Sequence, residues 1–159
     1  MTEFFSTLND TEYKQLTNAV SEITILIAGA DGKIQESELE WAEKVTKIRS
    51  YKMSEELIGF YQSVGATFSN DLSNLINELP VHIGDRQHIL ETRLEKLNPI
   101  LAKLSPVVAG KLHESFTSFA KHVAKASGGL FGFFAIGPKE GELIDLPMLE
   151  KIYYEEEEE

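Results

Sequence analysis

Apolar residues recur at steps of three and four along most of this chain, and this spacing constrains the fold more than any other feature. The first such stripe runs from Tyr13 to Ala30, and it is typical of an amphipathic helix that buries one face. No segment alternates apolar and polar residues for long enough to predict a strand. The sequence therefore predicts an all-α fold, a single-domain helical bundle of about seven helices.

Capping residues and helix breakers predict where these helices begin and end. Asp31-Gly32 is expected to close the first helix, because glycine accepts the left-handed backbone of a helix end. Pro99 is expected to break a helix, and Ser105-Pro106 is a start signal, a capping hydroxyl followed by proline. Helix starts are predicted near Asp10, Gln35, Ser54, Asp71, Asp85 and Ser105.

Charge and composition narrow the class of protein. The chain has 159 residues, a formal net charge of −11 and no cysteine, so disulfides and thiolate metal sites are excluded. The excess of acidic over basic residues argues against a nucleic-acid partner, because it repels the phosphate backbone. There is no apolar run long enough to cross a bilayer and no secretory signal pattern, and a cytoplasmic location is expected. Residues 1–154 are predicted to form the helical domain, and the glutamate run 155–159 a disordered acidic tail.

The stretch AGADGKIQESELEW, from residue 28 to residue 41, matches the later half of an EF-hand calcium loop. In that register Asp31 takes the fifth place, Gly32 the sixth and Glu38 the twelfth. The first and third places hold Ile27 and Gly29, which have no side-chain oxygen, so a calmodulin-type site is excluded. Two interpretations remain: an acidic, low-affinity site for calcium or magnesium, or a turn followed by a helix start that favours acidic residues.

Two segments of the chain are similar in sequence, which indicates a duplicated helix-loop-helix. The first loop reads IAGADGKI and the later one reads VAKASGGL, which aligns Gly32 with Gly128. Beyond the loops, ELEWAEKV from Glu38 corresponds to DLPMLEKI from Asp145, and the second copy carries an insertion that holds LFGFFAIGPKEGEL. The bundle is therefore predicted to contain two pseudo-repeated helical hairpins.

A helix that ends in A-x-A-D-G, followed by an aliphatic residue and a glutamate-headed helix, resembles the tellurite-resistance TerB family. That family is an all-helical bundle of repeated hairpins found in bacterial proteins, with a proposed divalent-metal site at acidic loop residues. The resemblance implies metal ligands at Asp31 and Glu38 in the first copy and Asp145 in the second, with Glu142 a neighbour. Ser127 departs from the pattern, because an aspartate would be expected there.

The inserted loop places Phe131, Phe133 and Phe134 among glycines. Three phenylalanines in so short a stretch usually pack inward, but an exposed cluster would mark a partner-binding surface, and both interpretations stay open. Helical spacing predicts further core residues elsewhere, namely Leu39, Trp41, Ala42, Val45, Ile48, Phe116 and Phe119.

Three common catalytic signatures are absent from the sequence. The G-x-S-x-G elbow, the G-x-G-x-x-G fingerprint and the phosphate loop are all absent. We therefore expect a non-enzymatic binding or scaffolding module with a protein partner, which the resemblance places in a bacterial stress or tellurite-resistance system. Two alternatives stay open: an interaction domain that needs no metal, and a metal-dependent hydrolase that uses clustered carboxylates.

Overall fold

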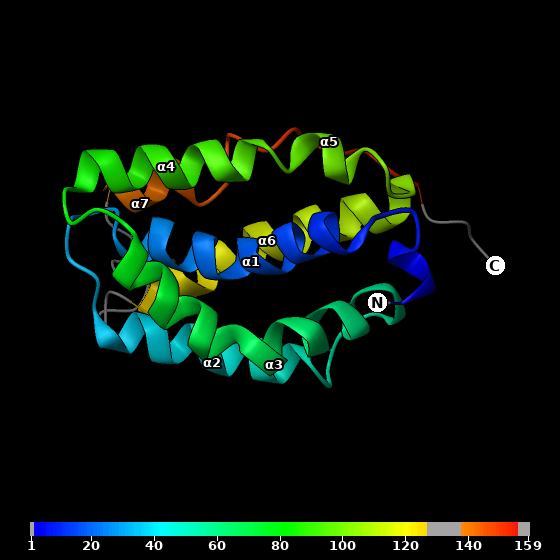
Figure 1. The fold of residues 1–159 in the computed structure, drawn as a ribbon, viewed down its shortest axis with the longest axis horizontal. Helices are drawn as coiled ribbons and strands as arrows, with labels where there is room; N and C mark the ends of the chain where they lie inside the picture. Colours follow the sequence, from blue (N-terminus) through cyan, green and yellow to red (C-terminus); the bar gives the residue numbers. More distant parts are fainter. Residues whose placement is uncertain (1, 127–137, 156–159) are drawn as a thin grey trace.

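The helices of the computed structural model pack in three layers, with α1 and α6 in the middle (Figure 1). The structure describes residues 2–126 and 138–155. The elements in chain order are η1 (Glu3–Phe5), α1 (Asp10–Ala28), α2 (Glu36–Arg49), α3 (Glu55–Glu78), α4 (Ile83–Glu95), α5 (Asn98–Leu101), α6 (Pro106–Ala126) and α7 (Pro138–Leu143). One outer layer is α2 with α3, and the other is α4 with α5 and α7. These described residues form helices and no strand, which confirms the predicted all-α class.

The central helix is α1, which contacts α2, α3, α4, α6 and α7. Every residue from Ala19 to Ala28 is buried, because helices surround this half of α1 on all sides. The helix is capped by Asn9 rather than by the predicted Asp10. Asn9 Oδ1 accepts a hydrogen bond from Glu12 N at 2.8 Å, and Glu12 Oε1 accepts one from Asn9 N at 3.0 Å, which is a capping box. None of the described helices combines the length and apolarity needed to cross a bilayer.

Two of the predicted helices are one helix in the structure. Asp71 was expected to start a helix, but it lies inside α3, which continues from Glu55 to Glu78. Its side chain has partners on two helices. Asp71 Oδ2 accepts a hydrogen bond from Thr67 Oγ1 of α3 at 2.7 Å, and it forms an ion pair with Lys14 Nζ of α1 at 3.4 Å. Aspartate is a common helix-capping residue, so Asp71 wrongly predicted a helix start. The apolar stripe of α3 continues on both sides of it.

The other predicted boundaries are close to the observed ones. Pro99 lies in the short helix α5, which follows α4 after a break, and Pro106 is the first residue of α6. Ser105 Oγ accepts a hydrogen bond from Val108 N at 3.3 Å, as expected of a capping hydroxyl. For α4 the cap is His82, not Asp85: His82 Nδ1 accepts a hydrogen bond from Asp85 N at 3.4 Å.

The segment after α7 runs along α5 and α6 without forming a helix. Asn98 holds it from both sides, because Asn98 Nδ2 donates to Met148 O at 3.0 Å and Asn98 Oδ1 accepts from Glu150 N at 2.8 Å. This segment was matched to α2 in the predicted repeat. Pro147 has no backbone N–H and disfavours the helical region for Leu146, which has φ 48°.

The expected total of about seven helices and the pseudo-repeat therefore stay predictions. The short helix α5 follows α4 so closely that the two can be counted as one. In addition, most of the inserted loop lies outside the described residues.

A buried arginine joins three helices. Arg49, at the end of α2, donates from Nη1 to Tyr61 Oη at 2.9 Å and to Ser115 O at 2.8 Å, and from Nη2 to Ser118 Oγ at 2.6 Å. Its guanidinium also lies 5.1 Å from the ring centroid of Tyr61 and 5.7 Å from that of Phe119. Within the described part of the chain Arg49 forms no ion pair, so neutral acceptors and aromatic faces hold this cation between α2, α3 and α6.

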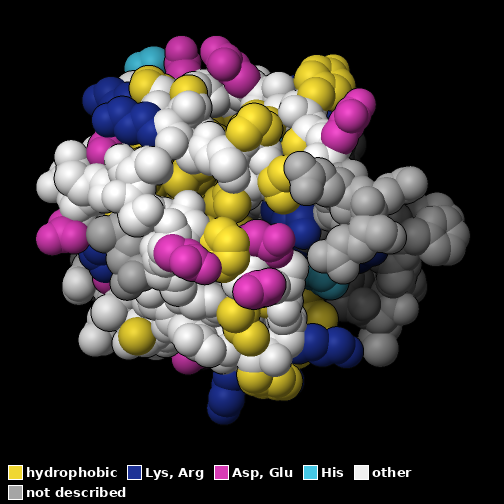
Figure 2. All heavy atoms as spheres, turned by 90° about the vertical axis from the view of Figure 1, so that its right-hand side faces the viewer, with side chains coloured by type: hydrophobic (Ala, Val, Ile, Leu, Met, Phe, Trp, Pro, Cys, Tyr) yellow, Lys and Arg dark blue, Asp and Glu magenta, His cyan; other side chains and the backbone are white. Residues whose placement is uncertain are grey.

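One end of the bundle is built from η1, the turn between α2 and α3, and the turn between α5 and α6 (Figure 1). Figure 2 shows this end, where hydrophobic side chains are interspersed with carboxylates and basic groups. The visible surface at this end is therefore of mixed character rather than of one sign of charge.

Candidate functional site

The loop between α1 and α2 closes on itself through the predicted ligand Asp31. Asp31 Oδ1 accepts a hydrogen bond from Lys33 N at 3.0 Å, and Gly32 N donates to Gly29 O at 2.9 Å. Gly32 has φ 94°, in the left-handed region that glycine enters without steric cost. These contacts fix the turn that the sequence predicted, although α1 itself ends earlier, at Ala28.

The second predicted ligand, Glu38, lies in the first turn of α2 and is buried. Its Oε1 accepts a hydrogen bond from Gln35 N at 3.2 Å, which forms a capping box at the start of its own helix. A glutamate three residues after the cap is the residue that this box requires. The glutamate of the motif therefore has a structural role at the start of α2.

Two side chains from α4 cover the end of α1 beside this loop. Arg86 Nη2 donates to Gly29 O at 2.8 Å, and Gln87 Nε2 donates to Leu26 O at 3.0 Å, so both satisfy carbonyls near the C-terminal end of α1. Burial lowers the pKa of Arg86, and the nearby Asp31 carboxylate partly opposes that shift. Because the Arg86 guanidinium is close enough to interact electrostatically with Asp31, a divalent cation bound at Asp31 would be repelled by Arg86.

We expect substitutions at Asp31 to distinguish a turn from a cation ligand. Asp31→Ala should lower the free energy of unfolding by about 1 kcal/mol, because Lys33 N loses its acceptor. Asp31→Asn keeps a side-chain oxygen and should stay within about 0.5 kcal/mol of wild type. Urea unfolding with and without calcium is the measurement. A calcium-dependent gain in wild type that Asp31→Asn removes would assign the loop to a cation instead.

The remaining predicted site residues lie at the other end of the chain. Glu142 is exposed on α7, and Asp145 is exposed in the turn that follows it. Among the residues that the structure describes, no three His, Cys, Asp or Glu side chains gather into a group that could hold a metal ion. Asp31, Glu38, Glu142 and Asp145 are thus not brought together as such a group. Phe131, Phe133 and Phe134 lie outside the described residues.

Comparison with known proteins adds no identification. No family model, curated protein or solved structure matches this chain. The resemblance to the TerB family therefore stays a prediction, and the chemistry of this chain has to be argued from its own residues.

An exposed apolar stripe on α2 is the first feature that the sequence analysis missed. Trp41 and Ile48 were predicted to be core residues, but they are 39% and 41% exposed, and Tyr51 in the following turn is 68% exposed. Phe116 and Phe119 are fully buried, as predicted. Ala42 and Val45 are buried as predicted and Leu39 packs against the core, so only Trp41 and Ile48 were wrongly placed on the buried side of α2.

Two lysines accompany these exposed side chains. Lys44 and Lys52 are exposed, and neither takes part in an ion pair among the described side chains. Steps of three and four residues place Lys44 between Trp41 and Ile48 on the helix surface. We name the set of Trp41, Lys44, Ile48, Tyr51 and Lys52 the α2 face. It combines large apolar groups with positive charge on a chain whose net charge is −11.

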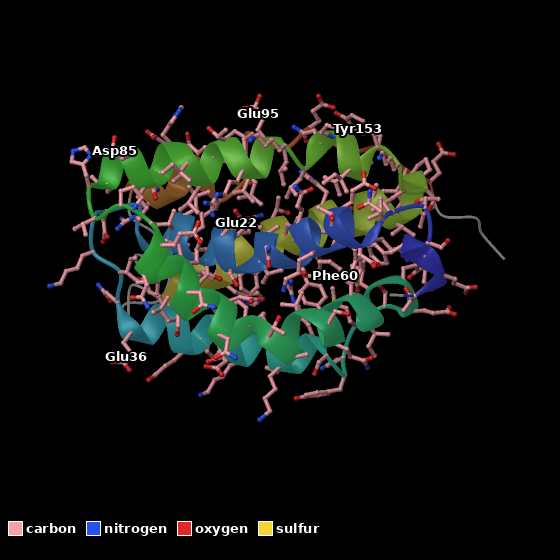
Figure 3. All side chains as sticks on the ribbon, in the orientation of Figure 1. Glu22, Glu36, Phe60, Asp85, Glu95 and Tyr153 are labelled. Carbon is pink, nitrogen blue, oxygen red and sulfur yellow. The ribbon has the colours of Figure 1, made fainter. Side chains whose placement is uncertain are left out.

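A buried carboxylate on α1 is the second missed feature. The side chain of Glu22 is only 9% exposed and lies on α1 beside α3 and α4 (Figure 3). Burial raises its pKa to about 7, the Arg93 charge opposes this shift, and the Glu78 charge adds to it. The sequence could have indicated this buried carboxylate. Glu22 is the single charged residue in the stretch QLTNAVSEITILIAGA, and charged residues are rare on the buried side of an amphipathic helix.

This raised pKa predicts a pH-dependent stability. A carboxyl group whose pKa rises from 4.5 to about 7 on folding stabilises the fold fully below pH 4.5, and this contribution is lost as the pH rises through about 7. Glu22→Gln stays neutral, so it should be more stable than wild type by about 1–2 kcal/mol near pH 8 and nearly equal to it near pH 4.5. Urea unfolding at the two pH values measures this. A difference that does not change with pH would contradict it.

Proposed function

We propose that this chain is a non-enzymatic helical module that binds an acidic segment of a partner protein through the α2 face. The observation that supports this proposal is the exposure of Trp41, Ile48 and Tyr51 beside two lysines that have no ion pair among the described residues. Trp and Tyr are enriched among the residues that dominate binding energy at protein interfaces. The spacing of Trp41, Lys44 and Ile48 suits a peptide that lies along a helix.

The charge of the chain favours an acidic protein segment over other occupants. A symmetric pairing of two copies through the α2 face would set Lys44 and Lys52 of one copy against the same lysines of the other. An anionic membrane would attract two lysines weakly and would repel a chain with net charge −11. An acidic segment with aliphatic or aromatic side chains complements both properties of the face.

The proposal in its simplest form needs no metal. Asp31 and Glu38 have structural roles in the turn and in the capping box, and Arg86 lies beside Asp31. The resemblance to the TerB family extends the proposal to an accessory or scaffold role in bacterial stress or tellurite resistance. That extension rests on analogy alone.

A peptide selection tests the proposal. Random peptides displayed on phage are selected on wild type and then assayed on Ile48→Asp and on the matched control Ile76→Asp, since Ile76 is a comparably exposed isoleucine on α3. Both variants should unfold within about 0.5 kcal/mol of wild type. We expect acidic peptides with apolar residues that bind wild type and Ile76→Asp and lose at least about tenfold in affinity on Ile48→Asp.

Three outcomes would contradict the proposal. Peptides that bind Ile48→Asp as tightly as wild type would place the interaction elsewhere. A selection that enriches no acidic peptides would show that the two lysines do not favour an acidic partner. Sedimentation that shows a wild-type dimer abolished in Ile48→Asp would assign the α2 face to a second copy of this chain.

A further inference from the structure

A polar groove runs between α1, α3 and α4, away from the α2 face. It consists of a cavity of about 190 Å³ and an adjoining one of about 350 Å³. Both are lined by Asn18 and Glu22 from α1, Glu78 from α3 and Arg93 from α4. Aliphatic walls come from Leu75 in the first cavity and from Leu97 in the second. The groove is therefore lined by both polar and apolar side chains.

Most charges in this groove are already paired. Lys14 Nζ lies 3.4 Å from Asp71 Oδ2, and Arg93 Nη2 lies 2.6 Å from Glu78 Oε1. Glu22 is held only by a long ion pair, because its Oε2 lies 4.0 Å from Arg93 Nη1 and no hydrogen bond reaches its carboxylate from residues 2–126 or 138–155. Lys96 also lines the second cavity, and it forms no ion pair among these residues. A buried carboxylate without a hydrogen-bond donor is unfavourable, and the free energy lost can be regained by a ligand that supplies the donor.

We propose that this groove binds the ammonium group of a small aliphatic amine, with Glu22 accepting its hydrogen bonds. An ammonium group brings one positive charge and three N–H donors, which match one ionised carboxylate and neutral acceptors such as the Asn18 amide oxygen. The carbon chain of the amine then lies against Leu75 or Leu97.

A divalent metal fits this groove less well than an amine. Calcium takes about six to eight oxygen ligands. The described side chains contain no group of three or more His, Cys, Asp and Glu that could hold a metal, and Glu78 is occupied by Arg93. A primary ammonium needs only one carboxylate acceptor, and the Glu22 carboxylate accepts no hydrogen bond from the described residues. This inference does not depend on the function proposed for the α2 face.

The linkage between binding and protonation gives a direct test. An ammonium group binds the ionised form of Glu22, so binding must lower the pKa of this carboxyl from about 7. Butane-1,4-diamine is the probe, and butane-1,4-diol is the uncharged control of the same length. The Glu22 carboxyl carbon is titrated by NMR with and without each compound. We expect the diamine to lower the Glu22 pKa by about one unit or more, and the diol to leave it unchanged.

Two variants complete the experiment. Glu22→Gln should lose diamine binding at least about tenfold, whereas Glu95→Gln should keep it, because Glu95 lies on the outer side of α4 (Figure 3). Affinity for wild type should fall about tenfold per pH unit below the Glu22 pKa. The proposal is overturned if the diamine leaves the Glu22 titration unchanged, or if it binds Glu22→Gln and wild type equally. The NMR titration of Glu22 in the wild-type protein tests the proposal independently of any change in stability that a variant causes.

Discussion

Phe60→Ala is expected to lower the free energy of unfolding by about 3–5 kcal/mol, the range found for truncating buried aromatic residues. Phe60 is fully buried and points from α3 toward α1 (Figure 3). Its ring centroid lies 5.5 Å from that of Phe5, 5.2 Å from that of Tyr61 and 6.1 Å from those of Tyr13 and Phe116. Removing this ring leaves a cavity where η1, α1, α3 and α6 meet.

Urea unfolding followed by circular dichroism measures this loss. Tyr51→Ala is the matched control, since it also removes an aromatic ring but from a side chain that is 68% exposed, and it should change stability by less than about 0.5 kcal/mol. A loss below about 1 kcal/mol for Phe60→Ala would show that the aromatic cluster does not join these elements as described.

Arg49→Ala should have the second largest effect, a loss of about 3 kcal/mol. The substitution removes the donors of three hydrogen bonds that link α2 to Tyr61 on α3 and to Ser115 and Ser118 on α6. It also removes the cation from the faces of Tyr61 and Phe119. Each lost hydrogen bond leaves a buried or half-buried acceptor without this partner.

Arg49→Lys separates charge from geometry at the same position. Lysine keeps the positive charge but lacks the planar fork that reaches several acceptors at once, so it should recover less than about half of the loss. Denaturant unfolding of both variants gives the comparison. Equal stability of Arg49→Lys and wild type would mean that the charge alone matters, and an Arg49→Ala variant as stable as wild type would contradict the structural role.

Individual helices were predictable because they depend on local patterns. The stripe from Tyr13 to Ala30 and the start at Ser105-Pro106 both act within a few residues, and the structure has α1 and α6 there. The continuity of α3 through Asp71 was not predictable, since a capping residue type gives the same local signal inside a helix as at its start. The segment after α7 was aligned with α2 and was therefore expected to be helical, but Pro147 in this segment already argued against a helix.

The candidate sites show a sharper limit of sequence reasoning. The motif around Asp31 and Glu38 was correctly placed at a turn and a helix start, but Arg86, which covers it, comes from a helix that is distant in the chain. The buried side of α2 was predicted from Ala42 and Val45, but how far α3 and α6 cover its flanks was not, so Trp41 and Ile48 were placed in the core. Glu22 could be flagged from its apolar surroundings, whereas its distance from Arg93 and Glu78 required the packing of three helices.

A fluorescence titration of Trp41 tests the proposed function most directly. Trp41 is the single tryptophan of the chain, and it belongs to the α2 face. An acidic, apolar peptide from the selection should shift its emission to shorter wavelength in a saturable manner, and the Kd should rise as salt is added because the two lysines contribute by charge. Peptide binding that leaves the Trp41 emission unchanged, or that is insensitive to salt, would contradict an interaction through this face.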